Sequence, residues 1–233
     1  MQAEDRPIHF SAELLHLPCK HEVSVLQKLY FDLSQTREGA YDNTDFSMPG
    51  RFRFFSKRGA KAQSMLLFLP DRFVVAEEWV DMPLSDFIGK LEAVAGHAMD
   101  ALNVPFLPAH TVTLRTTFAL THFDDARQFL LERACKQEGR LAPHFQRPIG
   151  VGGLRLVLPE TPEHSGSYNL IIESFRHSQK EVFVEVKAIF ARQRVVRDGL
   201  GLIADNFRAV QSFVTDTVFP FLNQYDIREE NWA

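Results

Sequence analysis

Two stretches with the apolar period of an amphipathic helix lie 116 residues apart, and their patterns match position by position. In both, apolar residues recur at intervals of three or four, as in a helix with one buried face. The first stretch has Leu84, Phe87, Leu91, Val94, Ala98 and Leu102, and the second has Leu200, Ile203, Phe207, Val210, Val214 and Val218. With one residue deleted, Pro105-Phe106-Leu107 also falls on Pro220-Phe221-Leu222. The sequence therefore predicts two long helices at equivalent places in a duplicated chain.

The segments before each long helix also repeat in the same order. Alternating apolar and polar residues predict strands near 8–14, 51–55, 65–69, 73–80, 111–120, 154–158, 168–175 and 182–190. Shorter helices are predicted from about Glu22 and from Asp124-Asp125. Each half thus reads strand, helix, about three strands, long helix. We expect an α+β fold in which long helices pack on one face of an antiparallel sheet.

This order places a boundary at Pro108. We expect residues 1–108 to form the first α+β repeat and residues 109–233 the second, either as separate domains or as one continuous pseudo-symmetric domain. The alternative is one mixed sheet without internal symmetry.

Composition excludes several classes of protein. The chain has 21 Phe against 4 Tyr and 2 Trp, so most of its aromatic side chains carry no polar group, and we expect them chiefly to fill the core. No apolar run reaches about 18 residues, so we expect no transmembrane helix, and the acidic start is unlike a signal peptide. We therefore expect a cytoplasmic protein with Cys19 and Cys135 reduced. The net charge of -4 argues against a protein that wraps nucleic acid.

If helices cover one face of the sheet, the other face carries polar side chains of both signs. Strand alternation places there His9, Ser11, Glu13, Arg51, Arg53, Thr113, Arg115, Thr117, Glu185 and Lys187. The candidate binding face consists of Arg51, Arg53, Arg115, Glu185 and Lys187. We expect a non-catalytic interaction or scaffold protein that binds a macromolecular partner, first of all a protein, through this face. The alternative is a small-ligand-binding protein or an enzyme with a Phe-lined apolar pocket between sheet and helix.

A basic and aromatic segment keeps an anionic ligand or a nucleic acid as further alternatives for the partner. Five positive charges are interleaved with phenylalanines: Arg51, Arg53, Lys57, Arg58 and Lys61. If Phe52 and Phe54 face the core, only Phe55 shares the open face with the arginines. We therefore favour a solvated hairpin over a stacking platform for bases.

The densest set of potential metal ligands is His16-Leu-Pro-Cys19-Lys-His21. Imidazole and thiolate groups suit zinc, but a structural zinc site needs a fourth ligand, and no CxxC or HxxxH pair occurs elsewhere. We therefore expect an ordinary strand-to-helix turn here and assign no metal and no cofactor.

No other pattern indicates catalysis, and we assign no catalytic residue. Neither cysteine lies in an activating motif, and no G-x-S-x-G sequence occurs. The glycines at 150–153 lead into a predicted strand, whereas a phosphate loop leads into a helix. We expect Glu77-Glu78 and the pair Glu173 and His177 to be solvent-side residues.

Two resemblances rest on this pattern. The segment Pro49-Gly50-Arg51-Phe52, the long strand ending in Thr121 and the helix from Asp205 to Phe221 resemble a sporadically distributed bacterial family of uncharacterised proteins. The repeated element order from Ile8 to Leu222 resembles the duplicated saddle of the TATA-binding-protein-like fold. These resemblances imply a bacterial origin and a saddle-shaped sheet, and they imply no activity.

Overall fold

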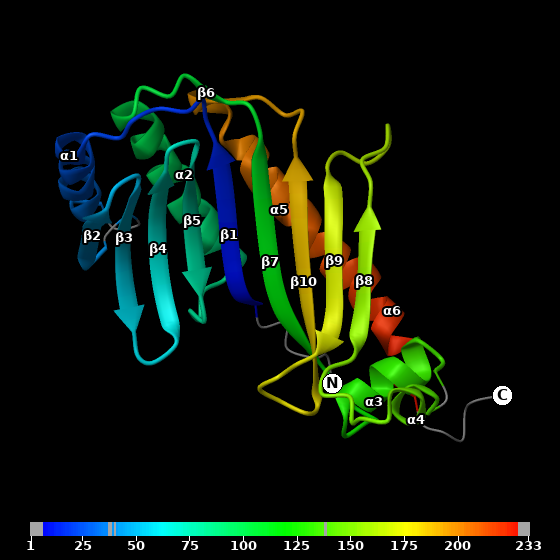
Figure 1. The fold of residues 1–233 in the computed structure, drawn as a ribbon. Coiled ribbons are helices and arrows are strands. Elements are labelled where there is room, and N and C mark those ends of the chain that lie inside the picture. Colours follow the sequence, from blue (N-terminus) through cyan, green and yellow to red (C-terminus); the bar gives the residue numbers. More distant parts are fainter. Residues whose placement is uncertain (1–6, 37–38, 40, 138, 228–233) are drawn as a thin grey trace.

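The computed structural model describes residues 7–36, 39, 41–137 and 139–227. Within these residues the centre of the fold is an antiparallel sheet of nine strands in the order β2-β3-β4-β5-β1-β7-β10-β9-β8 (Figure 1). The strands are β1 (Pro7–Leu15), β2 (Asn43–Met48), β3 (Arg51–Arg58), β4 (Ala62–Leu69), β5 (Arg72–Glu78), β7 (His110–Ala119), β8 (Gly153–Leu158), β9 (Ser167–Ser174) and β10 (Glu181–Phe190).

Helices cover one face of this sheet, behind the strands in the view of Figure 1. They are α1 (Val23–Ser34), α2 (Leu84–Ala101) and α5 (Gly201–Phe213), which continues through the π-helical turn η3 (Val214–Val218) into α6 (Phe219–Asn223). The remaining elements are α3 (Ala126–Gln128), the π-helix η1 (Phe129–Ala134), α4 (Leu141–Phe145), the 3-10 turn η2 (Arg197–Gly199) and the small pair β6 (Phe106–Leu107) and β11 (Val195–Val196). The expected mixture of helices with a large antiparallel sheet is confirmed.

The first strands of the two halves of the chain lie side by side in the middle of the sheet. β1 pairs with β7 in antiparallel register, with Phe10 opposite Leu114. Strands from residues before Pro108 lie on one side of this pairing, and strands from residues after it lie on the other. The sheet therefore runs without a break across the boundary expected at Pro108.

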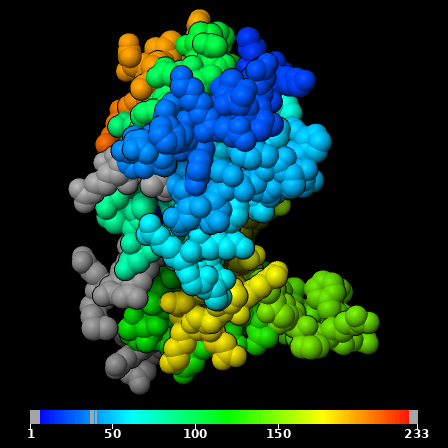
Figure 2. All heavy atoms as spheres, turned by 90° about the vertical axis from the view of Figure 1, so that its left-hand side faces the viewer, coloured from blue at the N-terminus to red at the C-terminus, as the bar shows by residue number. Residues whose placement is uncertain are grey.

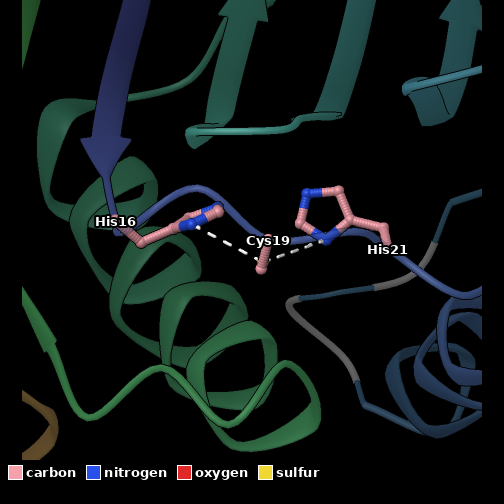
Figure 3. A group of neighbouring side chains, drawn as sticks. All are labelled: His16, Cys19 and His21. Carbon is pink, nitrogen blue, oxygen red and sulfur yellow. Dashed lines mark hydrogen bonds between the residues drawn. The ribbon is translucent and has the colours of Figure 1, made fainter.

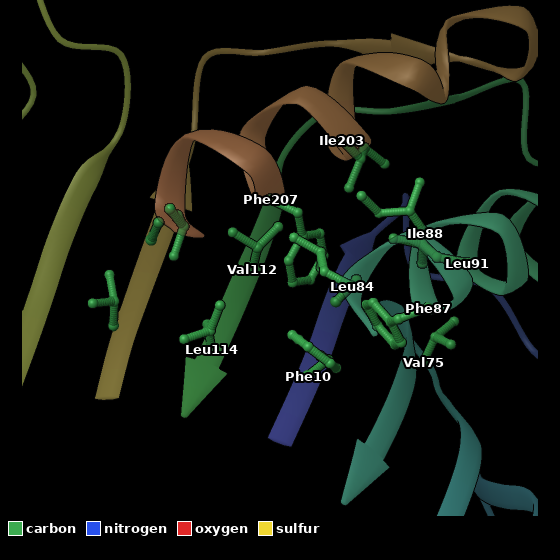
Figure 4. Close-up of a cluster of buried hydrophobic side chains, with 14 of the residues drawn as sticks. Phe10, Val75, Leu84, Phe87, Ile88, Leu91, Val112, Leu114, Ile203 and Phe207 are labelled. Atoms are coloured by element: carbon green, nitrogen blue, oxygen red, sulfur yellow. The ribbon is translucent and has the colours of Figure 1, made fainter. Parts of the chain in front are cut away.

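The core fills the space between the sheet and the long helices (Figure 4). The predicted helix faces are buried: among the twelve apolar positions of the two matched stretches, only Leu102, which directly follows α2, is partly exposed. The Phe87 ring stacks on Phe10 of β1 and meets Phe207 of α5 edge-on, with ring centroids 5.2 Å apart in each case. Phe52 and Phe54 face the core, as predicted.

The matching of the two Pro-Phe-Leu segments is wrong. Phe106–Leu107 forms strand β6, which pairs with β11, whereas Pro220-Phe221-Leu222 lies inside helix α6. Pro220 lies two residues after the end of the π-helical turn η3, where the α-helical hydrogen-bond ladder is already interrupted. Pro220 therefore does not end the second helical segment, which continues to Asn223.

The solvent-side placement of Glu77 is also wrong, since its side chain is buried. Glu77 lies opposite Phe10 on one neighbouring strand and Ser64 on the other, so it points to the helix-covered face. Lys90 of α2 supplies its counter-charge: Nζ donates to Glu77 Oε1 at 2.6 Å and to Ser64 Oγ. A carboxylate on the core face is tolerated because it is paired in this way.

Candidate binding face and histidine–cysteine cluster

The uncovered face of the sheet carries a network of ion pairs in its central strands. Arg115 of β7 donates to Glu185, its partner across the strands on β10, at 2.6 Å. Lys187 of β10 and Arg72 of β5 donate to the two carboxylate oxygens of Glu13, at 2.8 and 3.1 Å. We call these five side chains the central charge network. It spans four adjacent strands and connects the two halves of the chain.

Small side chains allow this network to cross the sheet. Lys187 reaches Glu13 over β7, where the intervening residues are Thr111 and Thr113. Partial burial opposes ionisation of Glu13, but hydrogen bonds and positive charge from Lys187 and Arg72 outweigh it and lower the pKa of Glu13 below its ordinary value. The carboxylate therefore stays ionised at neutral pH.

Arg51 and Arg53 lie on the same face but outside the network. Both belong to β3, which is two strand spacings of about 4.8 Å, or about 10 Å, from β5 and four spacings, or about 19 Å, from β7. Arg53 donates to Asp45 of β2 at 3.0 Å, and its guanidinium lies 4.8 Å from the Phe55 ring centroid. The predicted face thus divides into a central group of Arg115, Glu185 and Lys187 and an edge pair of Arg51 and Arg53.

A hollow of about 280 Å³ opens beside the network, at the end of β1 where the chain enters the sheet. The connection between β9 and β10 folds over this end and touches Trp79, which directly follows β5 in the other half. The ring of Phe175 stacks on that of Trp79, with centroids 6.1 Å apart. In Figure 2 this connection, in yellow, comes into view below the cyan atoms of the first half. Aromatic rings therefore wall the hollow opposite Arg115 and Glu173.

His9 forms part of the wall of this hollow. Its Nε2 lies 3.0 Å from Ser11 Oγ, whereas Nδ1 is buried and has no partner among the described residues. Burial, followed by the charge of Arg115, lowers the pKa of His9 to about 4. His9 is therefore neutral at physiological pH.

His16, Cys19 and His21 come together in the loop between β1 and α1 (Figure 3). One potential ligand atom from each lies within 4.8 Å of the other two. Cys19 Sγ is 3.8 Å from Nδ1 of each histidine. Both imidazoles are buried, while the Cys19 side chain is exposed. The cluster thus offers two imidazole groups and one thiol as potential metal ligands, and solvent can reach it at Cys19.

Comparisons with known proteins do not assign a family. No family model matches the sequence, and no curated protein matches it. None of the helices in the described ranges is both long enough and apolar enough to span a membrane. Function must therefore be inferred from the two sites themselves.

Sequence reasoning missed the aromatic wall of the hollow. Trp79 follows β5 and Phe175 follows β9, so they meet across β1, β7 and β10 and are far apart in the sequence. The backbone at Trp79 is uncommon, with a φ of 53°, which a residue with a bulky side chain rarely adopts. Dihedral angles are not visible in a sequence, so this contact could not be predicted.

A further buried histidine, His110, makes stability depend on pH. His110 of β7 is stacked on Phe190, accepts a 2.8 Å hydrogen bond from Asn206 Nδ2, and has a pKa lowered to about 4 by burial. Between pH 6.5 and 4 the unfolded chain binds a proton that the folded chain does not, so stability falls as pH falls through this window. His110 alone accounts for up to about 3 kcal/mol of this loss, at about 1.4 kcal/mol per pH unit.

We expect His110→Gln, which retains an acceptor for Asn206, to flatten the dependence of unfolding free energy on pH in this window by about one proton. Urea unfolding at several pH values between 7 and 4.5 measures this slope. His144→Gln, at an exposed histidine, is the control and should leave the slope unchanged. Equal slopes for wild type and His110→Gln would contradict the assignment.

Proposed function

We propose that this protein is a non-catalytic interaction protein that binds a protein partner through the uncovered face of its sheet. The observation that carries the proposal is the central charge network, which lies in the middle of that face and not at its rim. Its side chains are partly accessible, with exposed fractions from 16% for Glu185 to 39% for Lys187. A partner can therefore contact them without first unfolding any part of this chain.

Apolar side chains beside the network support the same conclusion. Partly exposed on the same face are Met65, Leu67, Val74, Ile171 and Ile189. Protein interfaces combine such an apolar area with a limited number of satisfied polar groups. The interior between sheet and helices is filled by buried side chains such as Phe10, Phe87 and Phe207, which favours the face over an internal apolar pocket.

We further propose that the face arose by duplication, in the arrangement of a TATA-binding-protein-like saddle. Moving outward from the centre, one half has the order β1, β5, β4, β3 and the other has β7, β10, β9, β8. In both halves the strand next to the centre is the last long strand before the long helix. The matched burial of the two helix faces supports the same correspondence. We place the protein in the cytoplasm, a location that its two free cysteines suit.

A charge swap tests the face while retaining its internal pairing. The double variant Arg115→Glu, Glu185→Arg keeps an ion pair across β7 and β10 but reverses the charges offered to a partner. We expect it to lose at least about tenfold in recovery of the bound protein, because reversed charges at an interface oppose association. The measurement is affinity capture from the native host, quantified by mass spectrometry.

The matched control is a swap on the helical side, Asp205→Arg with Arg208→Asp, at an exposed pair 2.6 Å apart on α5. It should recover the same protein as wild type. Recovery that is equal for wild type and both swaps would contradict the proposal. Recovery that nuclease treatment abolishes would indicate a nucleic acid and overturn the protein partner.

A further inference from the structure

We propose that His16, Cys19 and His21 bind one zinc ion, with a fourth coordination position open to solvent. This site lies in the loop between β1 and α1, apart from the central charge network, and does not depend on the proposed interaction. Zinc sites with three protein ligands and one exchangeable position are an established arrangement. The fourth protein ligand that the sequence lacks is therefore not required.

The spacing of the donor atoms is close to what zinc requires. Zinc–sulfur bonds of about 2.3 Å and zinc–nitrogen bonds of about 2.0–2.1 Å in tetrahedral geometry separate sulfur from nitrogen by about 3.6 Å. Cys19 Sγ lies 3.8 Å from Nδ1 of both His16 and His21. Figure 3 shows the two imidazoles on either side of the cysteine. The same tetrahedral geometry places the two nitrogens about 3.3 Å apart, and the potential ligand atoms here lie within 4.8 Å of one another, so the imidazoles must approach each other when the metal binds.

Hydrogen bonds hold the loop in place against the turn between β4 and β5. The backbone N–H of His16 donates to Asp71 O and that of Cys19 to Pro70 O, both at 2.9 Å. The third ligand is attached to the same turn through its side chain, since His21 Nε2 lies 2.7 Å from Leu69 O. Three consecutive carbonyl groups thus fix the positions of all three ligands.

The contact with Leu69 also determines which nitrogen of His21 can bind a metal. A carbonyl oxygen only accepts, so Nε2 carries the proton and Nδ1, which faces Cys19, keeps its lone pair. Metal-binding histidines typically donate their second ring nitrogen to a carbonyl or carboxylate in this way. His21 is therefore oriented and in the correct tautomer before any metal arrives.

His16 is the ligand that must adjust. Its Nδ1 lies 2.8 Å from Leu17 O as well as near Cys19, and its buried Nε2 has no partner within the described residues. By the same rule the contact with Leu17 O places the His16 proton on Nδ1, so coordination through Nδ1 requires that this proton moves to Nε2 and that the contact with Leu17 is exchanged for a bond to the metal. The His16 ring stacks on Phe73, with centroids 6.2 Å apart.

The fourth position has space on the accessible side. A hollow of about 790 Å³ lies against Cys19 and His21 and is bordered by Pro49, Phe52 and Pro70. Water fits there as the fourth ligand, and so does a donor group from another molecule. A thiolate with two imidazoles suits zinc better than magnesium or calcium, which prefer oxygen ligands.

Titration of the reduced, chelator-treated full-length protein tests the site. We expect wild type to bind one equivalent of Zn²⁺ in competition with a chromogenic chelator. Cys19→Ser and His21→Ala should each weaken binding at least about 100-fold, because even loss of outer contacts at metal sites weakens binding about 10–100-fold. Lys20→Ala and Cys135→Ser are the matched controls and should bind as wild type does.

Cobalt gives a second, spectroscopic readout. Co²⁺ added to wild type should produce the absorption of a tetrahedral ion and a thiolate-to-cobalt charge-transfer band, and Cys19→Ser should abolish that band. Far-UV circular dichroism establishes that each variant is folded. Failure of wild type to bind stoichiometric Zn²⁺, or a charge-transfer band that persists in Cys19→Ser, would overturn the proposal.

Discussion

Lys90→Met is expected to lower the free energy of unfolding by about 3–5 kcal/mol, the usual effect of removing one partner from a buried ion pair. The substitution keeps the length and apolar character of the stem but removes the ammonium group. Glu77, only 2% exposed, then remains on the core face without a counter-charge. Ser64 Oγ still donates to Glu77 Oε1 at 2.6 Å, but one hydroxyl group does not neutralise a carboxylate.

Removing the second charge should restore most of the lost stability. In Lys90→Met, Glu77→Leu no charge remains buried, and we expect an unfolding free energy within about 1–2 kcal/mol of wild type. Urea unfolding followed by circular dichroism measures all three proteins. Lys180→Met serves as the surface control, since its partner Asp124 is exposed. A double variant less stable than Lys90→Met would show that Glu77 is not left unpaired by the single change.

Phe87→Ala is expected to lower the free energy of unfolding by a similar amount, about 3–5 kcal/mol, through the cavity that it leaves. Phe87 is fully buried where the two long helices meet above β1. Its ring contacts Phe10 from the sheet and Phe207 from the other half of the chain. The loss should therefore affect both halves and not only the helix that carries the substitution.

Cooperativity distinguishes this expectation from a merely local effect. Far-UV circular dichroism and intrinsic fluorescence should report one coincident transition for wild type and for Phe87→Ala. Phe31→Ala, at a phenylalanine 64% exposed on α1, is the control and should change stability by less than about 0.5 kcal/mol. Two separated transitions would instead show that residues 1–108 and 109–233 unfold as independent domains.

Local periodicity accounts for what could be predicted of the fold. Burial of one side of a helix or strand repeats at a fixed interval, so the buried positions of α2, α5 and β10 follow from the spacing of apolar residues. Glu77 could not be placed in this way. The face of the sheet to which Glu77 points depends on the register between β5 and β1. Its charge can be buried on that face because Lys90, a charged residue on the buried face of α2, pairs with it.

The candidate sites show the same limit. The alternation of side chains along strands predicted that Arg115, Glu185 and Lys187 share one face. It could not show that Lys187 pairs with Glu13, 174 positions away. The histidines and Cys19 were visible as a group in the sequence. What makes their geometry suitable for a metal is the contact with Leu69, which lies 48 residues from His21 and leaves no local pattern.

The pairing of β1 with β7 has a consequence for how the chain folds during synthesis. Until residues 110–119 leave the ribosome, one edge of β1 has no neighbour, although β5 can already pair with its other edge. An unpaired strand edge is a site at which chains associate with one another. Closing contacts between strands so distant in sequence is also slow. The nascent first half is therefore a stage at which this protein is exposed to aggregation. Synthesis of β7 covers this edge of β1, and the other edge of β7 remains open until β10 is made.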